Sequence, residues 1–107
     1  MTTTVMEMVN FTLKPGTDNA QWLASAAELE GFLHQQPGFL YRALTQDEQG
    51  LWYDVVYWRD MDAAVAGGKA FMASSQGQQM CQFIELETVK VRHMPVSVEV
   101  MSCQGAD

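Results

Sequence analysis

The chain has 107 residues, of which 48% are apolar, a composition typical of one globular domain with a single core. Its 13 acidic and 6 basic residues give a net charge of −7, and the basic residues are scattered between Lys14 and Arg92. Nucleic acids and anionic membranes both require clustered positive charge, so we expect neither as a partner. With no apolar run of membrane-spanning length and no signal-peptide pattern, we expect a cytoplasmic protein.

The first half of the chain predicts a strand, a helix and a second strand. Residues 4 to 13 are rich in β-forming residues and end at a Lys-Pro-Gly turn, which predicts the first strand. Asp18 and Gln21 form a capping-box pattern, and apolar residues then recur at helical spacing, so we expect a helix from about 19 to 35. Residues 39 to 46 predict the second strand.

The second half repeats this pattern. Residues 51 to 58 predict the third strand, after a hairpin turn at residues 47 to 50. Asp60 caps a predicted second helix that ends near residue 73, a short helix is expected near Met80, and residues 87 to 94 predict the fourth strand. We expect these residues of the second helix to face inward: Met61, Ala64, Val65, Gly68, Phe71 and Met72.

Three smaller features of the sequence remain, of which the first has two readings. The Gly67-Gly68 pair either permits close packing against the sheet or a ligand, or is simply tolerated at a small cost to the helix. The segment from Ser74 to Gly77 reads as an interruption of the helix. Alternating valines after Pro95 (Val96, Val98 and Val100) predict one more edge strand, and Gln104 to Asp107 a loose end.

The element order predicts an α+β, ferredoxin-like βαββαβ domain. We expect one domain over residues 1–107, with a core at about 4–94, a C-terminal extension at 95–107 and an antiparallel sheet in the order 4-1-3-2. Helices should cover one face of this sheet. The other face is too apolar for water and predicts a homodimer: Met6, Met8, Tyr41, Tyr53, Val55 and Tyr57.

Three local features together carry a family resemblance. They are the end of the first strand at Leu13-Lys14-Pro15-Gly16, the Gln36-Pro37-Gly38-Phe39 start of the second strand, and Trp58 before an Asp-capped, Ala-rich helix. Over residues 4 to 94 the chain resembles the antibiotic-biosynthesis-monooxygenase-like superfamily of dimeric α/β barrels. The resemblance implies a homodimer whose two sheets form a shared barrel, with ligands bound between each sheet and its own helices.

Known activities of that superfamily include cofactor-independent oxygenation of aromatic polyketides and haem degradation. The haem-degrading members carry an Asn on the first strand, and a Trp and a haem-ligating His on the second helix. Here Val9 occupies the Asn position, Asn10 is one residue away on the other face, and the second helix has neither Trp nor His. The resemblance therefore extends to the fold and not to haem degradation.

A charged pair is predicted on the inner face of the hairpin. If the turn is centred on Glu48, Arg42 lies opposite Asp54, Leu40 opposite Val56 and Leu44 opposite Trp52. The same face continues to Trp58, and it should match Glu7, Val9 and Phe11 on the first strand and Val89, Val91 and His93 on the fourth. This arrangement brings four polar residues toward one interior region: Glu7, Arg42, Asp54 and His93.

Two interpretations of this polar cluster remain open. It is either a buried salt-bridge network that fixes the register, or the lining of a ligand cavity. In a cavity, Arg42 would anchor an anionic or carbonyl group, His93 would carry a proton with a carboxylate orienting it, and Trp58 would form a stacking wall. Arg42 beside the carboxylates argues against a dicationic metal, so we expect no metal and no cofactor.

Two classes of function follow from these interpretations. One is a cofactor-independent oxygenase or isomerase that acts on a small hydrophobic or aromatic metabolite. The other is a non-catalytic ligand-binding or stress-related dimeric module with a structural salt-bridge network. A purely structural dimer would require the buried charges to satisfy one another completely.

Overall fold

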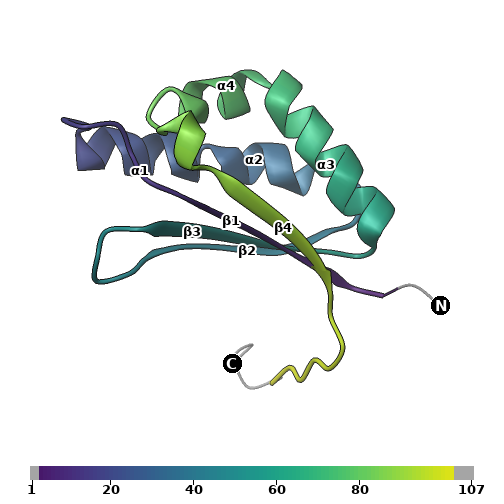
Figure 1. The fold of residues 1–107 in the computed structure, drawn as a ribbon. Helices are drawn as coiled ribbons and strands as arrows, with labels where there is room; N and C mark the ends of the chain where they lie inside the picture. The colour runs from purple at the N-terminus through teal and green to yellow at the C-terminus, as the bar shows by residue number, and fades with distance from the viewer. Residues whose placement is uncertain (1–2, 103–107) are drawn as a thin grey trace.

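Four antiparallel strands form one sheet in the computed structural model, which describes residues 3–102 (Figure 1). They are β1 (Val5–Phe11), β2 (Phe39–Gln46), β3 (Trp52–Trp58) and β4 (Lys90–Pro95). The order across the sheet is β2-β3-β1-β4, which is the predicted order read from the other edge. The ferredoxin-like fold is thereby confirmed. In this single chain the sheet is open, so the shared barrel stays a prediction.

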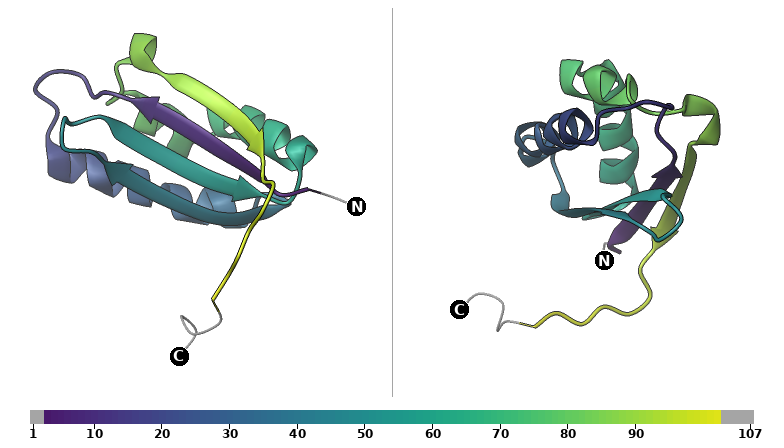
Figure 2. Two further views of the ribbon diagram at one scale, coloured as in Figure 1. Left: turned by 60° about the horizontal axis from the view of Figure 1, so that its bottom comes forward. Right: turned by 90° about the vertical axis from the view of Figure 1, so that its left-hand side faces the viewer.

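All four helices cover the same face of the sheet (Figures 1 and 2). They are α1 (Asn19–Ala27), α2 (Leu29–His34), α3 (Met61–Ala73) and α4 (Ser75–Cys81). The predicted caps are present, because Asp18 accepts the Gln21 N–H at 3.1 Å and Asp60 accepts the Ala63 N–H at 2.8 Å. The single helix predicted over 19–35 is two helices that meet at Glu28.

The segment before α4 and the start of β4 differ from the sequence predictions. The predicted interruption is confined to Ser74, whose extended backbone separates α3 from α4, whereas residues 75–77 are already helical. The Ser74 hydroxyl accepts the Gly77 N–H at 2.9 Å as the N-cap of α4. A short 3₁₀ helix (Leu86–Thr88) occupies the start of the predicted fourth strand. Its Thr88 hydroxyl accepts the Thr12 N–H at 3.0 Å and thereby joins the end of β1.

The predicted C-terminal edge strand is not formed within the described residues. Val96 donates its N–H to the Thr4 carbonyl at 2.8 Å, and the chain then leaves the sheet on the side away from the helices (Figure 1). Val98 and Val100 are exposed. Cys103 and the segment predicted as a loose end, Gln104 to Asp107, lie outside the described residues.

The inward face of α3 differs in part from the prediction, since Ala64 is buried as expected but three of the larger residues are not. Met61, Val65 and Met72 are exposed, whereas the buried positions are Ala63, Ala64 and Gly67. The physical reason is the indole of Trp58, which is 2% exposed and fills the space beneath the helix. The helix therefore turns its smallest side chains toward the sheet, although a hydropathy pattern favours its larger ones.

The hairpin between β2 and β3 has a different register from the predicted one. Leu44 pairs with Asp54 and Arg42 pairs with Val56, so the strands are shifted by two residues from the pairing of Arg42 with Asp54. A bulge between Phe39 and Tyr41 interrupts the ladder further along. Because side chains alternate with a period of two, this shift leaves Arg42 and Leu44 on the inner face. Leu40, which was predicted there opposite Val56, lies in the bulge and is exposed.

Asp47 explains why the turn is longer than predicted. Its backbone N–H bonds to the Leu51 carbonyl at 2.9 Å, and its carboxylate accepts the N–H groups of Gln49 at 2.9 Å and Leu51 at 3.0 Å. The same carboxylate accepts the Tyr53 hydroxyl at 3.0 Å. The loop is therefore closed by residues 47 and 51 and centred on Gln49, which sets the observed register.

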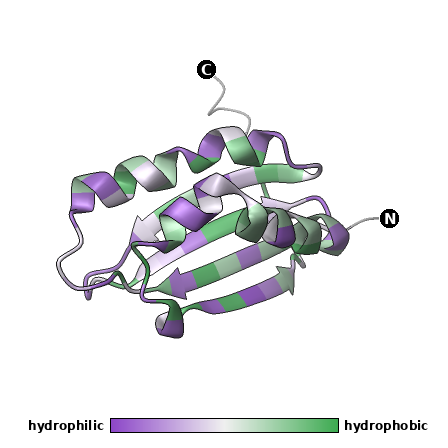
Figure 3. Cartoon of the chain, turned by 90° about the horizontal axis from the view of Figure 1, so that it is seen from above, coloured by the Kyte–Doolittle hydropathy of each residue, from purple (hydrophilic) through white to green (hydrophobic). Residues whose placement is uncertain are grey.

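Within residues 3–102, no helix or strand covers the opposite face of the sheet. Hydrophobic residues occur on both faces of the sheet, because in β1 and β3 they occupy neighbouring positions, as in Met8-Val9 and Val55-Val56. Figure 3 shows hydrophobic and hydrophilic bands along the strands. Most side chains of the opposite face are half-buried, and Tyr41 is 58% exposed. Among the described residues, no helix combines the length and the hydropathy that a membrane span requires.

We predict that Asp47→Asn lowers stability at neutral pH but not in acid. The Leu51 N–H, followed by the Tyr53 hydroxyl and the Gln49 N–H, lowers the pKa of Asp47 below its ordinary value of 3.8. A depressed pKa contributes stability that is present above 3.8 and is lost as the pH falls through the lower folded value. Urea unfolding from pH 7 to pH 2 should show the wild-type advantage closing in that window.

The exposed neighbour Glu48 supplies the matched control, since Glu48→Gln removes the same charge from the same loop. A constant difference between wild type and Asp47→Asn at every pH would contradict the role of the ionised carboxylate.

Candidate functional site

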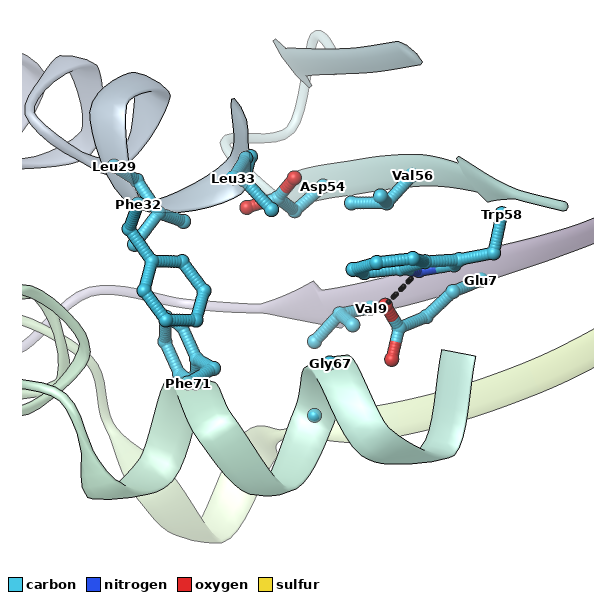
Figure 4. Close-up of a pocket in the computed structure, with 11 residues that line it drawn as sticks. Glu7, Val9, Leu29, Phe32, Leu33, Asp54, Val56, Trp58, Gly67 and Phe71 are labelled. Atoms are coloured by element: carbon cyan, nitrogen blue, oxygen red, sulfur yellow. Dashed lines mark hydrogen bonds between the residues drawn. The ribbon is translucent and has the colours of Figure 1, made fainter. Parts of the chain in front are cut away.

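A cavity of about 90 Å³ lies between the inner face of the sheet and helices α2 and α3 (Figure 4). Its floor comes from β1 and β3, and its walls come from the two helices. Apolar side chains and two glycines form most of the lining: Val9, Leu29, Phe32, Leu33, Val56, Trp58, Gly67, Gly68 and Phe71. Glu7 and Asp54 are the only charged residues in it.

Trp58 forms one wall of the cavity and is held on both sides. A Cβ atom added to Gly67 would collide with the six-membered ring of the indole, so only glycine allows α3 to approach this closely. The Phe39 ring packs against Trp58 edge-on, with centroids 6.0 Å apart. Of the two readings of the glycine pair, close packing therefore applies to Gly67, whereas Gly68 borders the cavity with no atom near its Cβ position.

Glu7 links this wall to the edge of the sheet. Its Oε1 accepts the Trp58 indole N–H at 3.1 Å (Figure 4), and its Oε2 lies 2.9 Å from His93 Nε2. The two side chains come together because β1 and β4 pair Glu7 directly with His93. The His93 side chain is 30% exposed and that of Glu7 is 12% exposed, so the pair leads from solvent to the cavity.

Arg42 and Asp54 form a separate and self-contained pair. The guanidinium donates Nε–H to Asp54 Oδ1 at 2.9 Å and Nη2–H to Oδ2 at 2.7 Å, a bidentate geometry. A further N–H, from Nη1, goes to the Ala26 carbonyl of α1 at 2.8 Å, and Nη2 also lies 4.0 Å from the Met80 sulfur. Both side chains are nearly buried, at 12% and 10% exposed.

The structure thus divides the five predicted site residues into two groups. Glu7, Asp54 and Trp58 line the cavity, whereas Arg42 and His93 do not and instead stand behind the two carboxylates. The predicted charged pair is present despite the wrong register, because Arg42 reaches diagonally across one pair of residues. The five therefore belong to one face of the sheet but not to one hydrogen-bonded cluster.

Sequence reasoning missed the helical walls of the site. Leu29, Phe32 and Leu33 of α2 read only as the apolar stripe of an amphipathic helix, and nothing in their spacing distinguishes a cavity wall from core. The one sequence signal was the glycine pair, of which Gly67 admits the Trp58 ring and Gly68 borders the open space beneath α3.

Metal and thiol chemistry have no support in residues 3–102. No group of three or more His, Cys, Asp or Glu side chains in this range is arranged to hold a metal ion. Cys81 is a free thiol, and burial raises its pKa, so it stays protonated at neutral pH and is a poor nucleophile.

Several solved structures share this architecture. A variant of SnoaB, a cofactor-independent oxygenase from Streptomyces nogalater, superposes with a TM-score of 0.71 at 16% identity, over 92% of this chain and 98% of that one. A Caulobacter crescentus protein named for the antibiotic biosynthesis monooxygenases gives 0.72 at 18% identity, over 92% of both chains. A Bordetella bronchiseptica protein of the same name gives 0.68 at 19% identity, over 90% and 99%.

This chain has the antibiotic-biosynthesis-monooxygenase-like fold. The resemblance seen in the sequence from residues 4 to 94 is confirmed at that level. No protein-family model matches the sequence, and no curated protein matches it either. Because the sequence identities to these three structures lie below 20%, the similarity establishes the fold and not the reaction.

We predict opposite effects for alanine at the two adjacent glycines. Gly67→Ala forces its methyl group against Trp58 and should lower the free energy of unfolding by about 1–3 kcal/mol. Gly68→Ala meets no atom within 4 Å and should raise it by up to about 1 kcal/mol, since alanine is the better helix former. Urea unfolding of both variants measures this, and equal effects would contradict the packing of Trp58 on Gly67.

Proposed function

We propose that the chain binds a small aromatic molecule in the cavity beneath α2 and α3. The observation that carries this proposal is a cavity walled by the rings of Trp58, Phe32 and Phe71, with the Glu7 carboxylate at its border. An apolar pocket with a few convergent polar groups is the usual form of a small-molecule site. Aromatic walls favour a ring that can stack or meet them edge-on.

The size of the cavity limits the ligand. At about 90 Å³ it is smaller than the roughly 150 Å³ cavity that admits benzene in an engineered protein. A ligand with one ring therefore requires a lining side chain to move. Phe71 is the candidate, because it is only half-buried, whereas Trp58 is held by Glu7 and Gly67.

For the chemistry, we propose oxygenation without a cofactor. The fold shared with SnoaB, named as a cofactor-independent oxygenase, supports this reaction class. Such a reaction requires a base that takes a hydroxyl proton from the aromatic substrate, so that the resulting anion donates electrons to dioxygen. Dioxygen then bonds to a ring carbon that carries a hydrogen, and the peroxide breaks its O–O bond and loses water, so one oxygen atom stays as a carbonyl and the substrate is the only reductant. Glu7 meets the bound molecule and is this base, while His93 orients it and exchanges the proton with solvent.

A non-catalytic ligand-binding module is the second candidate. The observation in its favour is the pair of Arg42 and Asp54, whose hydrogen bonds are satisfied by each other and by Ala26. Arg42 is then a structural residue that does not meet the ligand.

We also propose that the chain is a homodimer joined through the open face of its sheet. The apolar residues of that face, from Met6 and Met8 on β1 to Tyr41 and Tyr57, are too many for a solvated surface. Tyr41 and Tyr57 also pack together, with ring centroids 6.0 Å apart, and so form one continuous patch. A second copy supplies the simplest cover.

Oxygen consumption tests the catalytic proposal. Wild-type protein mixed with small aromatic quinols should consume dioxygen, and Glu7→Gln should reduce the rate by about 10²-fold or more while the quinol still binds. His93→Gln should reduce the rate less and alter its pH profile. Glu87→Gln, an exposed carboxylate change in the 3₁₀ helix, should leave the rate unchanged.

Binding without oxygen uptake by wild type would favour the non-catalytic module. Quinols that neither bind nor react would remove both candidates.

Sedimentation velocity at micromolar concentration tests the dimer. Met8 lies at the centre of the open face between Val55 and Arg92, so Met8→Glu should convert the dimer to monomer. Val65→Glu places the same charge on an exposed apolar position of α3 and should leave the dimer intact. A monomeric wild type would refute the proposal.

A further inference from the structure

The polar side-chain groups that the cavity leaves free for a ligand are hydrogen-bond acceptors. The lining contains two carboxylates and one indole N–H, and that N–H is already donated to Glu7 Oε1. The remaining lining side chains are aliphatic or are phenylalanine rings, which offer no N–H or O–H group. A bound molecule therefore finds no free side-chain donor among the residues that line the cavity.

The two carboxylates retain the capacity to accept. An ionised carboxylate has about four lone-pair sites on its two oxygens. Glu7 uses one on each oxygen, for Trp58 and His93, and Asp54 uses one on each for Arg42. Each side chain therefore has sites left for a donor from a ligand.

From these groups we infer that the cavity selects aromatic molecules that carry a hydrogen-bond donor and no negative charge. An alcohol or an amine fits, and a carboxylate is rejected. This inference rests on the proposed binding function and names its ligand class. The sequence suggested that Arg42 would anchor an anionic group of the ligand. In the structure the Arg42 guanidinium is paired with Asp54 and does not line the cavity, so the expected preference is the opposite one.

Electrostatics act in the same direction. A ligand carboxylate would lie beside Glu7 with like charge in an environment of apolar side chains, where repulsion is weakly screened. The net charge of −7 also disfavours the approach of anions from solution. The aromatic walls add an attraction for an ammonium group, so an amine gains from both the rings and the carboxylates.

Four probes with the same ring test this rule: toluene, benzyl alcohol, benzylamine and benzoate. Ligand-observed NMR titration of the full chain at pH 7 gives their affinities. We expect the alcohol and the amine to bind at least about tenfold more tightly than toluene, as a hydrogen bond to a charged group provides. Benzoate should bind more weakly than toluene.

Glu7→Gln is the decisive variant, because the amide keeps the shape of the side chain and adds a donor. It should reduce the preference for benzyl alcohol over benzoate by about tenfold or more. Glu87→Gln changes the net charge equally, outside the cavity, and should leave the preference unchanged.

The outcomes separate the inference from the proposed function. If benzoate binds as tightly as benzyl alcohol, the donor rule is overturned although the cavity binds aromatic molecules. If none of the four probes binds, toluene included, the cavity is not an aromatic site and the proposed function fails with it. Because the wild-type series alone decides these cases, the test stands even where Glu7→Gln does not fold.

Discussion

The buried ion pair of Arg42 and Asp54 is the interaction on which the inner layer of the molecule depends. It joins β2 to β3 by two charged hydrogen bonds and joins both to the end of α1 through the Ala26 carbonyl. Removing one partner would leave the other charge buried, which costs about 3–5 kcal/mol, whereas replacing both by apolar residues is often neutral. We therefore interpret the pair as a structural element that positions the helices. Arg42 binds the Ala26 carbonyl near the end of α1, just before α2 begins at Leu29.

This pair was predictable from the sequence even though the register was not. The side-chain period of a strand assigns Arg42 and Asp54 to the same face under any shift of two residues, and long side chains reach diagonal neighbours. The register itself depends on hydrogen bonds from the Asp47 carboxylate to Gln49 and Leu51, which a turn composition does not reveal. The order of the elements, the order of the strands and the face to which each strand residue belongs could thus be predicted, because they follow from the pattern of the sequence.

The burial of each residue, and whether it reaches the cavity, could not be predicted in the same way. Alternation puts His93 on the inner face, but β4 is an edge strand and the cavity does not extend to it. The orientation of α3 depends on the volume of Trp58, a contact between residues on different elements, and hydropathy favoured Met61 and Met72 instead. Which polar residues meet a ligand is set by such tertiary contacts. The sequence therefore indicated the face and a possible cavity on it, but not that α2 completes the lining or that Arg42 and His93 lie outside it.

The two faces of the sheet also differ in charge, and this difference connects the proposed dimer to the proposed site. The inner face carries Glu7 and Asp54, whereas on the open face the four strands carry Lys90 and Arg92 and no acidic residue. Two copies of a chain with a net charge of −7 can therefore bring these strands together without placing one strand carboxylate against another. Such pairing leaves the helices and the cavities on the outside of both sheets. Ligand entry and dimer formation then use opposite sides of the same strands, and neither obstructs the other.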